Sequence, residues 1–458
     1  MSLKVKYEKH ILLWCANGFA SVDMWLSVIR KLKEKEGIKI DFVFPEPSTL
    51  RLKDRNSGLF KLSEQFADDV IYRGFSCQWF ISSTLIEAST AMNKTKFSKL
   101  DAEISYLSLR LTKGKASKYY ILRVIGKYLS IIHKYFFQIR ESFNQHALYD
   151  FSLLSGADGI LYDATVEWKT VHSELKNELK NVQRFSMRHG LAITWVTSLF
   201  DCEQSVAKRS NVTVYSKSHL EVSGYKKCYG VLEENIVHAG IPRHDKDWIE
   251  FICNQFNNIK GDTFDSFVFL IGRQISPYHT AARKKKALKD IYNVICVKHK
   301  LKLVIKTHPK ESLDGIDGII YRDVLGVENY GKTWLFSNRH PFVLGKKSLF
   351  SISFYSGVPI DMLAINKPTI EYLNWEGLEG YDNKNSLRDE HGKPISQYTY
   401  VDIVLGARSK LELEQHVESI LNQYETTVLS LRLRYDNFFK TFDNASEMVA
   451  NDIYKKIQ

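Results

Sequence analysis

The chain has 458 residues, which is too long for one ordinary core and predicts two domains of roughly 150–250 residues each. Its 44% apolar and 13% aromatic content excludes a disordered protein. A formal net charge of +12 favours an anionic partner, which leaves nucleic acid, an anionic membrane face and a phosphorylated substrate open.

The sequence also indicates a cytoplasmic location. The charged N-terminus does not resemble a signal peptide, and no window approaches the roughly 20 apolar residues of a membrane span. Six cysteines lack Cys-x-x-Cys spacing, which favours reduced thiols over zinc sites.

The first part of the chain alternates strands with helices. Apolar runs predict strands, and apolar residues at helical spacing predict helices between them. The strands are expected at 10–16, 38–44 and 69–72, and the helices at 22–36 and 59–66. This order is typical of a doubly wound α/β domain.

A helical insertion is expected at about 95–146, where apolar residues at helical spacing alternate with lysines and arginines. It is either a helical hairpin packed on the sheet or a basic surface that meets anionic lipid or a charged acceptor. The alternation then resumes with a strand at 159–163, a helix at 165–185 and a strand at 191–198. Further short strands are expected at 211–215 and 236–240.

The second half predicts another parallel sheet. A strand at 267–271, a helix at about 280–298 and a strand at 301–305 follow a polar linker at 257–265. We therefore expect an N-terminal domain at 1–256, a C-terminal domain at 266–435 and a tail helix at 436–458 that packs back on the first domain.

Three turns of the second domain combine residues suited to anions, and parallel strands bring such turns to one edge. Glycine admits a close approach of the backbone, arginine can bind phosphate with two hydrogen bonds, and hydroxyls at a helix start can donate to an anion. Helix capping and an ordinary proline turn are the alternative explanations for the serines and the histidine. The residues are Gly272, Arg273 and Gln274; Lys306, His308, Pro309 and Lys310; and Ser351, Ser353, Ser356 and Gly357.

Several common site motifs are missing from the sequence. It contains no Gly-x-Gly-x-x-Gly and no His-Glu-x-x-His. We therefore expect no dinucleotide cofactor and no essential metal.

The layout resembles GT-B glycosyltransferases, in which two Rossmann-like domains face each other across a cleft. Lys306-Thr307-His308-Pro309 is similar to the His-Pro motif of bacterial transferases that use CMP-activated sialic acid or Kdo, and Ser351, Ser353 and Ser356 resemble their paired-hydroxyl motif. Ala157-Asp158-Gly159 resembles a degraded form of their acidic motif. CDP-glycerol phosphotransferases carry a similar His-Pro.

The resemblance implies a glycosyltransferase that moves an acid sugar from a CMP donor to a growing surface polysaccharide, such as lipopolysaccharide O-antigen or capsule. The C-terminal domain would bind the nucleotide sugar, and the acceptor would be lipid-linked or an oligosaccharide. A CDP-glycerol or UDP-sugar transferase is the alternative. A nucleic-acid-binding protein is the alternative from another class, but the basic residues are dispersed, so we expect no nucleic-acid partner.

Glycosyl transfer also needs a carboxylate across the cleft, as general base or nucleophile. Asp163 ends a predicted strand and ranks first, followed by Asp201 and then Asp158. Association with the inner face of the cytoplasmic membrane is a further expectation, based on the basic insertion.

Overall fold

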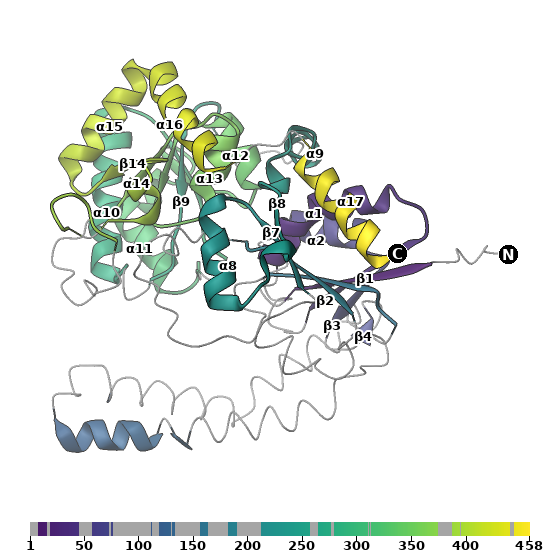
Figure 1. Cartoon of the computed structure of the whole chain (residues 1–458). Coiled ribbons are helices and arrows are strands. Elements are labelled where there is room, and N and C mark those ends of the chain that lie inside the picture. Colours follow the sequence, from purple (N-terminus) through teal and green to yellow (C-terminus); the bar gives the residue numbers. More distant parts are fainter. Residues whose placement is uncertain are drawn as a thin grey trace.

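A computed structural model describes part of the first predicted domain and most of the second. It covers residues 8–15, 19–44, 57–72, 75–76, 111, 119–129, 131–132, 156–163, 182–189, 212–256, 264–275, 279–309, 311, 313–373, 387–393, 395–439 and 444–458. Within this part of the chain the strands form two sheets (Figure 1).

The first sheet has the order β4-β3-β2-β1-β5-β6-β7-β8, and all its neighbouring strands are parallel except β3 and β4. Buried apolar runs such as Ile11–Trp14 suit a sheet that is covered on both faces. The strands are β1 (Lys9–Trp14), β2 (Ile38–Phe44), β3 (Asp69–Tyr72), β4 (Phe75–Ser76), β5 (Gly159–Tyr162), β6 (Gln183–Ser186), β7 (Val212–Ser216) and β8 (Ile236–His238).

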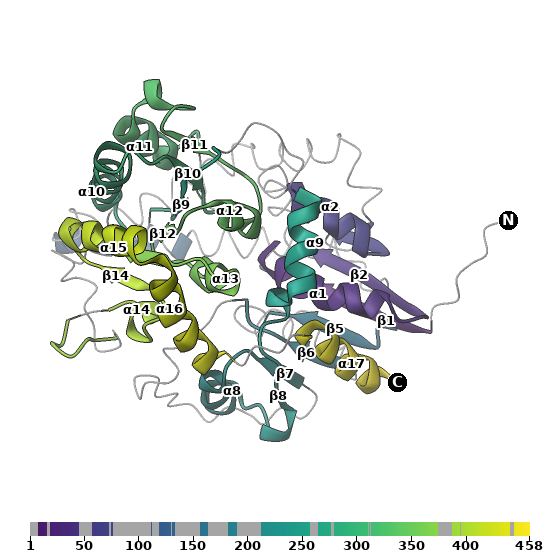
Figure 2. The ribbon, with the colours of Figure 1, turned by 90° about the horizontal axis from the view of Figure 1, so that it is seen from above.

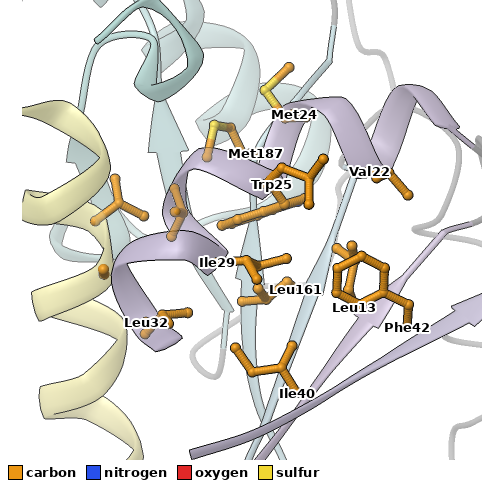
Figure 3. Packing of buried hydrophobic residues seen from close by; sticks show 14 of the residues in the cluster. Leu13, Val22, Met24, Trp25, Ile29, Leu32, Ile40, Phe42, Leu161 and Met187 are labelled. Atoms are coloured by element: carbon orange, nitrogen blue, oxygen red, sulfur yellow. The ribbon is translucent and has the colours of Figure 1, made fainter. Parts of the chain in front are cut away.

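Helix α1 (Phe19–Lys33) is central to the first core. Its apolar stripe is buried against β1, β2 and β5, and Figure 3 shows Trp25 and Ile29 of α1 above Leu13 and Leu161 of the sheet. The indole N–H of Trp25 donates to the Tyr162 carbonyl at 3.3 Å, which ties α1 to the end of β5. Helices α2 (Ser57–Phe66) and α9 (Lys246–Phe256) contribute to the same core.

The rest of the first domain connects its last strands to the second domain. These short elements are η5 (His219–Glu221), α8 (Val222–Tyr229), η6 (Glu233–Asn235) and η7 (Pro242–His244).

The second sheet repeats the strand order of the first and is parallel throughout. Its order is β11-β10-β9-β12-β13-β14, so the direction of winding reverses between β9 and β12. The strands are β9 (Val268–Ile271), β10 (Leu303–Lys306), β11 (Trp334–Phe336), β12 (Ser351–Ser353), β13 (Thr369–Tyr372) and β14 (Leu405–Ala407).

Helices connect the strands of this second sheet and cover it (Figure 2). They are α10 (Ala281–Tyr292), η8 (Asn293–Lys298), α11 (Ile316–Leu325), η9 (Val327–Asn329), α12 (Pro341–Lys347), α13 (Val358–Ala364), α14 (Gln397–Tyr400), α15 (Lys410–Asn422) and α16 (Tyr424–Phe438). The expected helix at 280–298 is present, with Thr280 as its N-cap and a π-helical last part, η8.

The final helix, α17 (Ala445–Ile457), returns to the first domain, as the sequence predicts (Figure 2). Val449, Ala450 and Ile453 belong to the core built around α1. The hydroxyl of Ser446 donates to the Pro242 carbonyl at 2.9 Å, and the Asp245 carboxylate accepts from the first backbone N–H groups of the helix. Because α16 packs on α13 and α15, the chain crosses between the domains after Phe438.

The end of one predicted helix is wrong. The helix expected at 165–185 does not extend to Phe185, because Gln183–Ser186 form β6 between β5 and β7. The charged residues that precede this segment have helical spacing, but Phe185 is fully buried in the parallel sheet, and pairing on both sides decides its conformation. The strand expected at 191–198 lies outside the described residues, as does most of the 95–146 insertion.

None of the described helices has both the length and the apolar character needed to cross a bilayer.

Candidate active site

Predicted site residues of both domains lie beyond the carboxyl ends of strands, at one edge of each sheet. In doubly wound sheets, ligands bind beyond these ends, where the winding reverses. This point lies between β9 and β12 in the second sheet and between β1 and β5 in the first. The loops after β9, β10 and β12 carry the residues that the sequence analysis expects to bind the donor nucleotide, and we call them the donor edge. We call the loops after β5, β6 and β7 the facing edge.

At the donor edge, Gly272 follows β9 and is held close to the neighbouring strand. Its N–H donates to the Lys306 carbonyl at 2.8 Å. The half-buried Arg273 places its guanidinium over the Tyr355 ring, 5.8 Å from the ring centroid, and thereby links the loops after β9 and β12. Gln274 is half-buried beside it. Tyr355 itself has φ 59°, a strained conformation for a non-glycine residue that is common at functional sites.

The loop after β10 lies next to this turn, because Lys306 is in register with Ile271. The ammonium of Lys306 donates to the Asn338 carbonyl at 3.3 Å. The backbone N–H of His308 donates to the Glu311 carboxylate, so a side chain fixes the start of the His-Pro turn. Pro309 follows, whereas Lys310 lies outside the described residues.

The serines of the third turn have different surroundings. The hydroxyl of Ser351 is 2.6 Å from that of Thr369 within the sheet. The Oγ of Ser353 is buried at the end of β12 and has no hydrogen-bond partner among the described residues, an arrangement that is uncommon in folded proteins. Ser356 accepts from the Val358 N–H at 3.3 Å and caps the start of α13, and Gly357 lies between them.

At the facing edge, Asp163 follows β5 and is fully buried. An oxygen of its carboxylate is hydrogen-bonded to Nδ1 of His189, whose side chain is 37% exposed. Lys217, which follows β7, donates to the His189 carbonyl at 3.1 Å, and burial lowers its pKa to about 8. The sequence analysis did not identify His189, because the strand before it was expected to be a helix.

The other two carboxylates are not part of this pair. Asp158 precedes β5, and its carboxylate accepts from the His10 N–H at 2.8 Å and lies 3.4 Å from the Lys9 ammonium. It therefore lies at the amino end of the strand that carries Asp163 at its carboxyl end. Asp201 lies outside the described residues.

A largely buried ion network joins the two domains. Arg243 of η7 contacts the Asp23 carboxylate of α1 at 2.6 Å and also pairs with Asp361 of α13. His340, the N-cap of α12, lies 3.1 Å from Asp23, and His244 lies 2.8 Å from Asp361.

The pKa shifts of this network reflect its charges. Burial alone would raise the pKa of Asp361, but the ion pair with Arg243 and the hydrogen bond from His244 hold it well below its usual range. Lys217 lies near enough to Asp163, Arg243 and Asp361 for their charges to shift its pKa. The facing edge therefore lies close to α13, the helix that follows the last turn of the donor edge.

Among the described residues, no three His, Cys, Asp or Glu side chains gather as a metal-binding group. The expectation that no metal is essential stays a prediction.

No protein-family model and no curated protein matches the chain, whereas solved structures match along nearly its whole length. The S. aureus MnaA–UDP co-structure is 13% identical with a TM-score of 0.54, and the alignment covers 98% of this chain and 97% of that chain. The fold is GT-B-like.

Two further structures with this fold are similar. Methanocaldococcus jannaschii UDP-GlcNAc 2-epimerase in complex with UDP-GlcNAc and UDP is 12% identical with a TM-score of 0.52, over 97% of this chain and 99% of that chain. The wall teichoic acid polymerase TagF, as its H444N variant, is 11% identical with a TM-score of 0.51, over 99% of this chain and 90% of that chain. At these identities the likeness shows the GT-B-like fold alone.

Arg243→Met tests the joint between the two domains of this GT-B-like fold. The substitution leaves Asp23 and Asp361 without their shared cation, so we expect the free energy of unfolding in urea to fall by about 3 kcal/mol at pH 7. The pKa of Asp361 is depressed in the folded protein, so its pairing stabilises above the unfolded pKa of about 4 and is lost at lower pH. The difference between variant and parent should therefore shrink below about pH 4.

Arg434→Met is the matched control. Arg434 is 46% exposed and lies 3.9 Å from Asp402, so we expect a change below about 1 kcal/mol. Equal stability of Arg243→Met and the parent at pH 7 would contradict the assignment.

Proposed function

We propose that the protein is a nucleotide-sugar-dependent glycosyltransferase of cell-surface polysaccharide synthesis, with a CMP-activated acid sugar such as Kdo or sialic acid as its donor. One observation carries the proposal: the cationic loops with Arg273, Lys306 and His308 lie at the donor edge, and the Asp163–His189 pair lies at the facing edge. The His-Pro resemblance favours the CMP donor.

In this proposal the donor edge binds the leaving phosphate. Arg273 can approach the phosphate with its planar guanidinium, and Lys306 supplies a second cation from the neighbouring strand. The free hydroxyl of Ser353 can add a hydrogen bond from β12. Fixed charges and donors of this kind stabilise the charge that develops on a leaving group, which removes the need for a metal ion.

The acceptor hydroxyl would be activated at the facing edge. Asp163 is fully buried, so its carboxylate orients the His189 imidazole instead of meeting the substrate itself. The exposed side of that ring can take the proton from the attacking hydroxyl, and the buried carboxylate stabilises the imidazolium that results. The two residues therefore act as one acid–base unit.

A CDP-glycerol-dependent or UDP-sugar-dependent enzyme is the second candidate. It is supported by the fold shared with a wall teichoic acid polymerase and with structures that contain UDP or UDP-GlcNAc. The nucleotide that binds separates the candidates, since the proposed phosphate site is common to all of them.

A thermal-shift panel of CMP, CDP, UDP and GDP tests the donor. Bound nucleotide should raise the melting temperature by mass action, and we expect the largest rise with CMP. Arg273→Ala and His308→Ala should each abolish this rise while the melting temperature without nucleotide stays near that of the parent. A larger rise with CDP or UDP would favour the second candidate. If both variants bind nucleotide like the parent, the donor edge is wrongly assigned.

Turnover of an Asp163→Asn variant tests the acid–base unit. We expect a loss on the order of a hundredfold or more with donor binding retained, because the imidazole loses its orienting charge. His189→Ala should lose a similar amount, and the double variant little more, since the two residues act together.

Asp158→Asn is the control for this experiment, and its turnover should stay close to that of the parent. If Asp201→Asn alone abolishes turnover, the reacting carboxylate is Asp201. EDTA should leave the activity of the parent unchanged.

The insertion supports association with a membrane surface. Helix 120–129 stands apart from both sheets in Figure 1, where it is drawn in blue, and it exposes Tyr120 by 70%, Ile121 by 72% and Tyr128 by 66%. Residues 111–140 contain seven lysines and arginines and no aspartate or glutamate. An apolar helix face with only basic charges suits an anionic lipid surface, such as the inner face of the cytoplasmic membrane.

Sedimentation with lipid vesicles tests this surface. The parent should sediment with anionic vesicles but not with neutral ones, and salt should release it, since each basic residue contributes about 1 kcal/mol that ions screen. Ile121→Ser with Tyr128→Ser should weaken sedimentation, whereas Ile319→Ser, an exposed apolar site on α11, should not. Equal recovery in the supernatant with both lipids would exclude the membrane proposal.

A further inference from the structure

A fully buried lysine lies beneath the donor edge. Lys284 of α10 has no exposed side-chain surface, and its ammonium pairs with Glu311, which is equally buried, and with Asp317 at 2.7 Å. The ammonium also lies 4.4 Å from the centroid of the Tyr321 ring. A charge in such a place needs several partners, because leaving water costs several kcal/mol.

The same cluster holds the backbone of both cationic loops. Lys284 donates to the Arg273 carbonyl at 3.0 Å, and Asp317 accepts from the Ile275 N–H at 3.3 Å, which together fix the loop after β9. Glu311 accepts from the His308 N–H, and its own N–H donates to the His308 carbonyl at 2.9 Å, which fixes the loop after β10.

The cluster also explains why residue 272 is a glycine. A Cβ at this position would lie 2.6 Å from an oxygen of Glu311 and 2.8 Å from the hydroxyl of Tyr321, both closer than real contacts allow. Tyr321 donates to Glu311 at 3.0 Å, so neither atom can move away without breaking the cluster. The backbone of the loop therefore rests directly on the buried charges.

We propose that Lys284 and Glu311 are positioning residues, which hold Arg273 and His308 in the arrangement that binds the donor phosphate. Neither side chain is exposed to a ligand, so both act through the two loops. A phosphate site needs its charged groups held within a fraction of an ångström, and supporting residues of this kind provide that constraint. The identity of the ligand rests on the proposed function, whereas the ordering of the loops does not.

The test replaces the two charges together. Lys284→Met alone would leave two carboxylates without their cation and endanger folding. Adding Glu311→Leu replaces the fully buried pair by apolar groups of similar volume, and only Asp317, which is 10% exposed, then lacks this cation. Lys285→Met is the matched control, because Lys285 is the next residue of α10 and is 51% exposed in its pair with Asp323. Circular dichroism and the melting temperature establish that each variant is folded.

Hydrogen exchange gives the first readout and needs no ligand. In the double variant, the amides of residues 272–275 and 307–308 should exchange faster than in the parent, while those of 351–353 and all amides of Lys285→Met should not change. Parent-like exchange in a folded double variant would overturn the proposal, even if the protein binds none of the nucleotides and the proposed function fails.

Nucleotide affinity gives the second readout, measured by calorimetry with CMP, CDP and UDP. For the nucleotide that the parent binds, we expect the double variant to lose about tenfold in affinity. Turnover at saturating donor should fall as well, because a displaced Arg273 stabilises the leaving phosphate less. When the double variant is combined with Arg273→Lys, the loss of binding free energy should be smaller than the sum of the two separate losses, because both changes act through Arg273. Fully additive losses would show that the cluster does not act through this loop.

Discussion

One buried cation helps to fix the relative position of the two domains. Arg243 is held between Asp23 of the first core and Asp361 of the second domain, and all three side chains are at most 16% exposed. An ion pair in such a place is costly to break, because each remaining charge keeps its desolvation penalty. Helix α13, which follows the donor edge, is thereby fixed against η7.

Lys284 is a second buried cation of this kind, within the second domain. Like Arg243, it lies between two carboxylates from different elements, and in both places the ion pairs join segments that the sheets alone would leave independent. Hydrogen bonds of the parallel ladders set the register of the strands but not the conformation of the loops beyond them. Buried charges with directional partners supply that missing constraint, so the precision of the proposed site comes from electrostatics and the fold from apolar burial.

The sequence predicted those features that have local causes. Apolar runs ended by Gly272 or by His308-Pro309 define β9 and β10, and parallel winding then places both turns at one edge. The same approach failed at Gln183–Ser186, where pairing with β5 and β7 overrides the helical charge pattern before it. His189 was missed for that reason, although a histidine directly after a strand is the signal that would have identified it.

Four cations of the protein have two kinds of surroundings. Arg243 and Lys284 are neutralised by carboxylates inside the protein, so neither is available to a phosphate. Arg273, by contrast, rests on the Tyr355 ring, and Lys306 donates to a backbone carbonyl where the winding of the second sheet reverses. Ligands of doubly wound sheets bind at such a point, so these two cations are the ones that the proposed donor phosphate would meet.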